Sequence, residues 1–126
     1  MVNKARPHLG IDLVCEPGAA LVWPCGGLFV LRGQAYPDDP RFFSVHVSPD
    51  GQPAGVRVKV LYARPDVAAW PSCVHRGERM GSAQDLRLRY PDPDGAGPAG
   101  PIVNHVHVEV RLDGVAVDPT PYLEVA

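Results

Sequence analysis

Two histidines near the end of the chain have the spacing that metal or proton chemistry requires. His105 and His107 lie in the run 104–111, in which apolar and polar residues alternate without a break. This period of two predicts a half-buried strand with both imidazoles on one face, about 7 Å apart. Imidazoles placed in this way can share a metal ion or a catalytic water. The alternative is a solvated strand face that happens to carry two histidines.

The other end of the sequence supplies candidate partners. His8 and Asp12 are separated by three residues, and a short apolar run, 11–14, begins there. Zinc is commonly held by three protein ligands and a water, drawn from histidine nitrogens and carboxylate oxygens. His8, Asp12 and His107 would form such a set, with His105 beside the open position. The alternative is that His8 and Asp12 are ordinary turn residues.

Three further polar residues, Glu109, His46 and His75, are candidates for this chemistry. Glu109 shares the face of the two histidines, where a carboxylate can orient a ligand imidazole through the ring's second nitrogen. The alternative for Glu109 is an exposed strand glutamate. His46 is predicted to be a plain surface or edge histidine and His75 to be exposed, because nothing in their spacing indicates a ligand role.

Composition narrows the class of protein. The chain has 126 residues, 45% of them hydrophobic, which predicts one domain over 1–126, with a core over 5–125. There are 12 basic and 14 acidic residues, so the clustered positive face that binds nucleic acid is not indicated. No apolar run reaches the length of a membrane span, and residues 1–6 show no signal-peptide pattern.

The cysteine count is odd. With Cys15, Cys25 and Cys73, at most one internal disulfide can form, and the absence of a CxxC pair disfavours a cysteine zinc knuckle. Cys15 and Cys25 flank a predicted hairpin and could approach each other. The alternative is that all three are small buried apolar residues.

Fifteen prolines and thirteen glycines interrupt the sequence, and no stretch keeps helical periodicity for three turns. This pattern is typical of an all-β domain. Asp113-Gly114 predicts a hairpin turn, and 77–81 a tight hairpin-like corner. Loops are predicted at 36–40, 66–71 and 91–101. Strands are predicted at 11–14, 20–23, 28–31, 42–47, 56–65, 86–90, 104–111 and 115–117.

Motifs at both ends of the chain resemble the lysostaphin-type zinc metallopeptidases. The matching segments are His8-Leu9-Gly10-Ile11-Asp12, Pro17-Gly18, Trp23-Pro24, the run 105–111, Asp113-Gly114 and Val117-Asp118-Pro119. The resemblance implies a compact, mainly antiparallel β domain of the duplicated hybrid motif kind. It also implies Zn²⁺ bound by His8, Asp12 and His107, with His105 as one of two catalytic histidines.

One branch of that family, the leukocyte cell-derived chemotaxin 2 branch, is more similar still, on segments 6–8, 62–65, 77–81 and 118–123. Its vertebrate members are secreted signalling proteins that keep the fold and the zinc site. The peptidases place a second catalytic histidine after a Tyr-Ala pair, whereas here Arg64 follows Tyr62-Ala63. A guanidinium can support an oxyanion but stays protonated and cannot act as a base.

This branch therefore implies a secreted zinc-binding recognition or signalling module, without efficient catalysis, that binds a protein receptor or a glycan. The principal alternative is a zinc-dependent peptidoglycan endopeptidase that cleaves cell-wall peptide cross-links, with His105 as its base. A third is a bacterial or phage wall-binding module that kept the groove and lost the chemistry.

Overall fold

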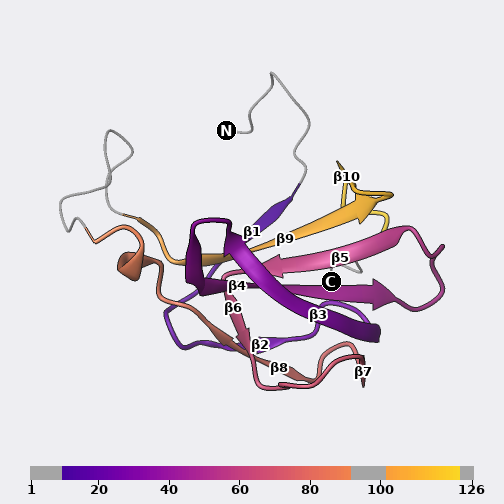
Figure 1. Cartoon of the computed structure of the whole chain (residues 1–126), viewed down its shortest axis with the longest axis horizontal. Coiled ribbons are helices and arrows are strands. Elements are labelled where there is room, and N and C mark those ends of the chain that lie inside the picture. Colours follow the sequence, from indigo (N-terminus) through magenta and orange to yellow (C-terminus); the bar gives the residue numbers. More distant parts are fainter. Residues whose placement is uncertain (1–9, 92–101, 123–126) are drawn as a thin grey trace.

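A computed structural model describes residues 10–91 and 102–122, and nearly all of its regular structure is β-strand (Figure 1). One short 3₁₀ helix, η1, interrupts the strands and is too short to span a membrane; the described residues contain no membrane-spanning helix. In chain order the elements are β1 (Ile11–Val14), β2 (Ala20–Val22), β3 (Gly27–Tyr36), β4 (Asp39–Pro49), β5 (Val56–Leu61), β6 (Ala63–Pro65), β7 (Ser72–Val74), β8 (Arg79–Ala83), η1 (Leu86–Leu88), β9 (His105–Leu112) and β10 (Val115–Val117).

Two antiparallel sheets hold these strands. The larger has the order β1-β9-β5-β4-β3-β7, and β10 joins it by pairing with the end of β9. The smaller has the order β2-β8-β6. Figure 1 shows β9, β5, β4 and β3 side by side, with the small sheet beneath them. The predicted histidine strand is therefore an interior strand, paired with β5 on one side and with β1 on the other.

Alternation along β5 and β9 separates a buried face from a polar one. Val56, Val58 and Val60 are buried, whereas Arg57 and Lys59 between them are only partly covered. The buried residues of both sheets form one apolar cluster, so the sheets pack against each other. Its members include Trp23, Phe29, Val45, Val47, Ala63, Met80, Ala83, Val106, Val108 and Val110. The polar face of the large sheet is thus turned away from the core.

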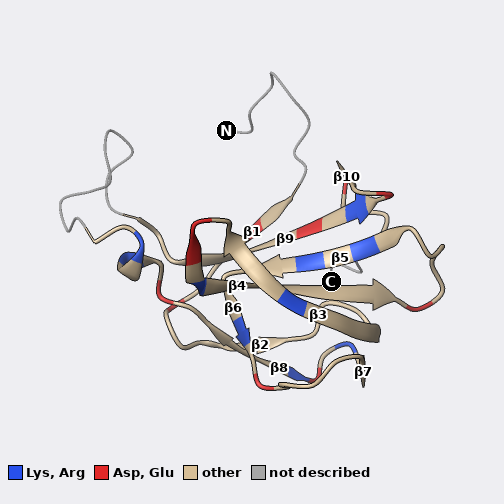
Figure 2. Cartoon of the chain, viewed as in Figure 1, with Lys and Arg blue, Asp and Glu red and all other residues tan. Residues whose placement is uncertain are grey.

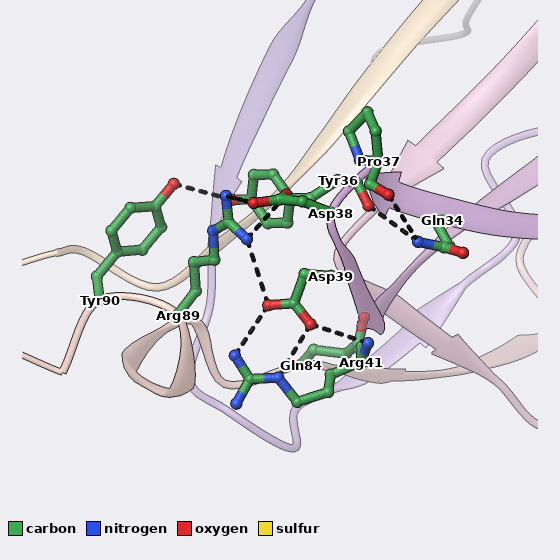
Figure 3. Close-up of polar contacts among 9 residues, drawn as sticks. All are labelled: Gln34, Tyr36, Pro37, Asp38, Asp39, Arg41, Gln84, Arg89 and Tyr90. Carbon is green, nitrogen blue, oxygen red and sulfur yellow. Dashed lines mark hydrogen bonds and ion pairs between the residues drawn. The ribbon is translucent and has the colours of Figure 1, made fainter.

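The hairpin between β3 and β4 is fastened to the segment that follows η1 (Figure 3). Asp39 is buried and accepts hydrogen bonds from Arg41 Nε at 2.9 Å and Nη2 at 2.8 Å. Arg89 Nη1 donates to Asp38 at 3.1 Å and lies 3.4 Å from Asp39. The Arg41 guanidinium holds the pKa of the Asp39 carboxyl well below its usual range. The ion pairs fix the end of the hairpin that lies near Tyr36.

Two strand predictions are wrong in an informative way. Residues 86–90 form no strand. Leu86–Leu88 make up η1 instead, because the Asp85 side chain accepts a hydrogen bond from the backbone of Arg87 and caps a helical turn. The predicted strand 56–65 is broken at Tyr62, which has a φ of +69°. That turn carries the chain from β5 in the large sheet to β6 in the small one.

Two other expectations also need correction. The corner predicted at 77–81 contains a turn at Gly77, but β8 begins at Arg79. Cys15 and Cys25 do not pair: Cys15, Cys25 and Cys73 are all free thiols. Burial raises the pKa of the Cys25 thiol to about 11, whereas Cys73 is exposed. The loop predicted at 91–101 lies almost wholly outside the described residues.

Candidate functional site

The pairing of β1 with β9 places Asp12 directly opposite His107. Asp12 Oδ1 lies 2.7 Å from His107 Nδ1, and the Asp12 side chain is 57% exposed. Because an ionised carboxylate can only accept, Nδ1 carries the proton of this hydrogen bond. A carboxylate oxygen and an imidazole nitrogen in contact at the surface are two ligands of the kind that zinc takes.

The His107 ring lies against the backbone of Gly10. A Cβ atom at Gly10 would overlap the ring atoms Cε1 and Nε2. The imidazole therefore occupies space that is open only because residue 10 has no side chain. This glycine, which the sequence showed only as part of a motif, fixes the place of the ring beside Asp12.

Glu109 faces His107 from the same strand face. Its Oε1 lies 3.8 Å from His107 Nε2, which is beyond hydrogen-bonding distance, whereas its Oε2 accepts from Arg111 Nε at 2.9 Å. Glu109 is buried, at 7% exposure, so the alternative of an exposed strand glutamate is wrong. Its role in orienting a ligand imidazole stays a prediction, because its hydrogen bond goes to Arg111.

The third predicted zinc ligand, His8, lies outside the described residues. Within residues 10–91 and 102–122, no group of three His, Cys, Asp or Glu side chains is close enough to hold a metal ion. The structure therefore brings together Asp12 and His107, two members of the predicted set, and the metal site as a whole stays a prediction.

His105 lies on the same strand face, two residues before His107, and its orientation suits a proton acceptor. Its Nδ1 lies 2.8 Å from the carbonyl oxygen of Val103. A carbonyl can only accept, so Nδ1 carries the proton and Nε2 keeps its lone pair. The ring of Tyr62 packs edge-on against His105 at 5.5 Å, and Tyr36 stacks on Tyr62 at 5.5 Å. These aromatic contacts hold the imidazole in place.

Arg64, which replaces the second histidine of the peptidases, lies on β6 of the small sheet and is exposed. Its guanidinium carbon is 5.2 Å from the centre of the Phe43 ring. With Phe43, Gln84 and Asp85 it lines an open hollow of about 410 Å³. Within the described residues, neither histidine of β9 is hydrogen-bonded to Arg64: His105 contacts the carbonyl of Val103, and His107 contacts Asp12.

A row of polar residues that sequence reasoning missed crosses the sheet beside His107. His46 on β4, Lys59 on β5 and Glu109 on β9 are successive cross-strand partners. His46 is thus half-buried in an interior strand, and its prediction as a surface or edge residue is wrong. Burial, with the nearby cations Lys59 and Arg57, lowers the pKa of His46 to about 4. His75 is exposed, as predicted.

Comparison with known proteins places the chain in a family. No established family profile matches it. Mouse leukocyte cell-derived chemotaxin-2 is 30% identical over 118 residues, which cover 94% of this chain and 67% of that protein. The chain belongs to the leukocyte cell-derived chemotaxin-2 family. The family membership inferred from the segments around His8, 62–65 and 118–123 is confirmed.

Solved structures extend the comparison from the chemotaxin family to the fold. Two crystal forms of Helicobacter pylori Csd3 superpose with TM-scores of 0.63 and 0.61, at 16% and 18% identity. They cover 98% and 96% of this chain, which spans only 29% and 28% of Csd3. The predicted all-β, lysostaphin-type fold is confirmed, and this member of the chemotaxin family is a metallopeptidase-fold protein.

Proposed function

We propose that the chain is a zinc-binding recognition domain of the metallopeptidase fold that does not hydrolyse peptides efficiently and acts outside the cell. The observation that carries the proposal is the contact of Asp12 Oδ1 with His107 Nδ1 at 2.7 Å, in space kept open by Gly10. Asp12, His107 and His8 would hold the metal. Membership of the chemotaxin family supports a secreted signalling or recognition role with a protein receptor or a glycan as partner.

The donor chemistry fits zinc. One imidazole nitrogen and one carboxylate oxygen come from adjacent strands, and a third ligand from the segment before β1 would complete a set of three. Zinc held by these residues would polarise a group bound at its open position and would stabilise the fold, because only the native pairing of β1 with β9 brings Asp12 and His107 together. His107 Nδ1 would give up its proton on binding, and Nε2 would then carry a proton facing Glu109.

Weak catalysis follows from the position of Arg64. A hydrolytic site needs a base and a donor that steadies the oxyanion, and loss of one positioned donor typically lowers turnover by about 100- to 1000-fold. His105 has the tautomer of a base, but Arg64 packs over Phe43 and cannot take a proton. The side chains around His107 therefore support binding better than turnover.

The second candidate function is a zinc-dependent peptidoglycan endopeptidase. It is favoured by one observation, the 2.8 Å contact of His105 Nδ1 with the carbonyl oxygen of Val103. This contact assigns the proton of the neutral ring to Nδ1 and leaves Nε2 to accept a proton on the same face as His107. The fold shared with Csd3 is compatible with this function as well as with the binding role.

Metal analysis tests the proposal. Purified protein should contain about one zinc per chain, and removal of the metal by a chelator should lower the melting temperature. Asp12→Ala and His107→Ala should each lose the metal, whereas His75→Ala, which changes an exposed histidine elsewhere, should keep it. Full zinc content in both ligand variants would show that the assignment is wrong.

Hydrolysis separates the two functions. The zinc-loaded protein is incubated with cell-wall material and with a glycine-rich peptide, and the products are followed by mass spectrometry. We expect no cleavage. Turnover that is abolished by a chelator and by His105→Ala would establish the endopeptidase and overturn the binding role.

A further inference from the structure

A second hollow, of about 400 Å³, opens on the polar face of the large sheet. Its lining comes from β4, β5, the end of β9 and two turns, and the zinc proposal uses none of it. The lining residues are His46, Ala54, Gly55, Arg57, Lys59, Arg111, Asp113 and Gly114. Figure 2 shows the basic segments of β5 and β9 side by side, with an acidic segment of β9 next to them.

The hollow carries more positive than negative charge. Arg57, Lys59 and Arg111 line it, against the carboxylate of Asp113 and that of Glu109 nearby. Glu109 is already bound to Arg111 Nε. Burial lowers the pKa of Lys59, and Glu109 raises it by more than Arg111 lowers it, so the excess of positive charge in the hollow comes mainly from Arg57 and Lys59.

One hydrogen-bond donor of Arg57, which lines the hollow, has no acceptor in the described part of the chain. Its Nε atom is buried and has no hydrogen-bond partner among the described residues. A buried N–H group without an acceptor is unfavourable, and hydrogen bonds to charged groups are the strongest that could replace it. His46 does not serve as the acceptor, because its Nε2 already contacts Ser44 Oγ at 2.9 Å. A carboxylate that enters the hollow would lie against the Arg57 guanidinium, and it would reach the buried Nε group only after a shift of that side chain.

The register of the strands places the hollow at a fixed distance from His107. Lys59 is paired with Glu109, two residues along β9 from His107, and Arg57 is paired with Arg111, four residues along. At about 3.3 Å per residue, these positions lie roughly 7 and 13 Å from His107 along the strand. An extended peptide covers the same distance in two to four residues.

We propose that this hollow is a carboxylate subsite, which binds the acidic group of a peptide or protein segment whose other end lies at the Asp12–His107 pair. Arg57 and Lys59 form the contacts, and Arg111 is held in place by Glu109. The inference rests on the proposed recognition function and names the chemistry of the ligand. It predicts a negative charge two to four residues from the group that contacts the metal site.

A single carboxylate fits better than a polyanion. The hollow is a small open depression with a small excess of positive charge, and the chain as a whole carries a net charge of −2. A sulfated glycan or a nucleic acid would need an extended basic surface to release enough counterions. The side chains here can neutralise only one compact anionic group.

The test uses the zinc-loaded full chain and two peptides, N-acetyl-tetra-alanine with a free carboxylate and the same peptide as an amide. The side-chain Nε–Hε resonances of Arg57 and Arg111 are followed by NMR. We expect the carboxylate peptide to shift the Arg57 resonance and the amide to leave it in place. Arg57→Gln should weaken binding of the carboxylate peptide by about tenfold. Arg79→Gln, which removes the same charge from an exposed ion pair on β8, should leave binding unchanged.

If Arg57→Gln does not fold, Lys59→Gln should show the same loss. Equal binding of the two peptides, or unchanged binding by Arg57→Gln and Lys59→Gln, would overturn the subsite. A larger shift with inorganic sulfate, at matched ionic strength, would also overturn it in favour of a sulfate group.

The titration is repeated on His107→Ala and on chelated protein, to separate the subsite from the zinc proposal. If the Arg57 resonance still shifts in these zinc-free proteins, the subsite is supported even where the zinc proposal fails. If the shift requires zinc, the carboxylate binds the metal and the subsite is overturned.

Discussion

Gly10 determines whether His107 can present its imidazole beside Asp12. The ring lies where the Cβ atom of any other residue would be. We therefore predict that Gly10→Ala displaces the ring and lowers zinc affinity by about tenfold, the scale on which supporting residues act at metal sites. Competition with a zinc-sensitive dye measures the effect.

Gly26→Ala is the matched control for this change. A Cβ at Gly26 would lie at least 3.5 Å from its neighbours and should be accommodated without movement. If Gly10→Ala binds zinc as tightly as the parent, the present position of His107 is not the one that holds the metal, and the ligand must be presented from another rotamer.

Residue types and spacing predicted the shared face of His105, His107 and Glu109 and the association of Asp12 with His107, but not the neighbours on β4 and β5. Alternation indicates which residues share a face, and the structure confirms the strand that carries both histidines. The contact of His107 with Asp12 depends on the register of β1 against β9, which local alternation does not encode; ligand chemistry and the motifs at both ends of the chain predicted it instead. The row that joins His46 to Lys59 and Glu109 escaped prediction for the same reason, because it depends on the order β4-β5-β9.

At the scale of elements, one amide joins three segments that meet at the start of β9. Asn104 Nδ2 donates to the carbonyl oxygens of Cys15, at 3.1 Å, and Gln84, at 3.0 Å, while its Oδ1 accepts from the Leu86 backbone at 2.8 Å. Asn104→Ala would leave these backbone groups without their partners. We expect a loss of about 2 to 4 kcal/mol in the free energy of unfolding, measured by urea denaturation.

Gln34→Ala is the control for Asn104→Ala, because the Gln34 amide also bonds two carbonyl groups, those of Tyr36 and Pro37, but in an exposed position. Its removal should change stability by about 0.5 kcal/mol or less. If the two variants lose a comparable free energy of unfolding, the backbone groups that contact Asn104 are hydrogen-bonded to water in Asn104→Ala. The junction is then not a cooperative part of the fold.

The same junction explains why some elements could not be predicted. Residues 86–90 alternate in the sequence, yet only Leu86 is buried and Leu88 is 60% exposed, because Asp85 and Asn104 hold the segment in a helical turn. The break at Tyr62 is invisible locally because a tyrosine gives no signal for a positive φ. In contrast, Asp113-Gly114 forms the predicted turn, since both residues accept φ values of +51° and +85°.

At the scale of the whole molecule, the small net charge of −2 conceals a local group of cations on one face of the large sheet. One face of the large sheet is packed in the core, and the other gathers the cations that surround His46. Lys59, Arg57 and Arg111 all disfavour protonation of that imidazole, and Glu109 favours it. The global stability of the protein should therefore respond to pH in a range where most carboxylates are already ionised.

The sign follows from the two pKa values of His46. In the folded protein the imidazole stays neutral down to about pH 4, whereas in the unfolded chain it takes up a proton near pH 6.5. Between these values the unfolded state binds more protons, so the free energy of unfolding rises with pH. We predict that chelated protein loses about 1 to 2 kcal/mol from this group between pH 7 and pH 4.5, after allowance for partial solvent screening.

His46→Gln isolates this contribution, because an amide can still bond Ser44 Oγ but does not titrate. Urea denaturation at pH 7 and pH 4.5 should show a smaller loss in His46→Gln than in the parent chain, and His75→Gln, at an exposed position, should behave as the parent. An equal loss in all three proteins would mean that neither burial nor the cations on β5 and β9 keep the His46 imidazole neutral. The positive charge of the second hollow would then be screened by solvent, and an anion would gain little by entering it.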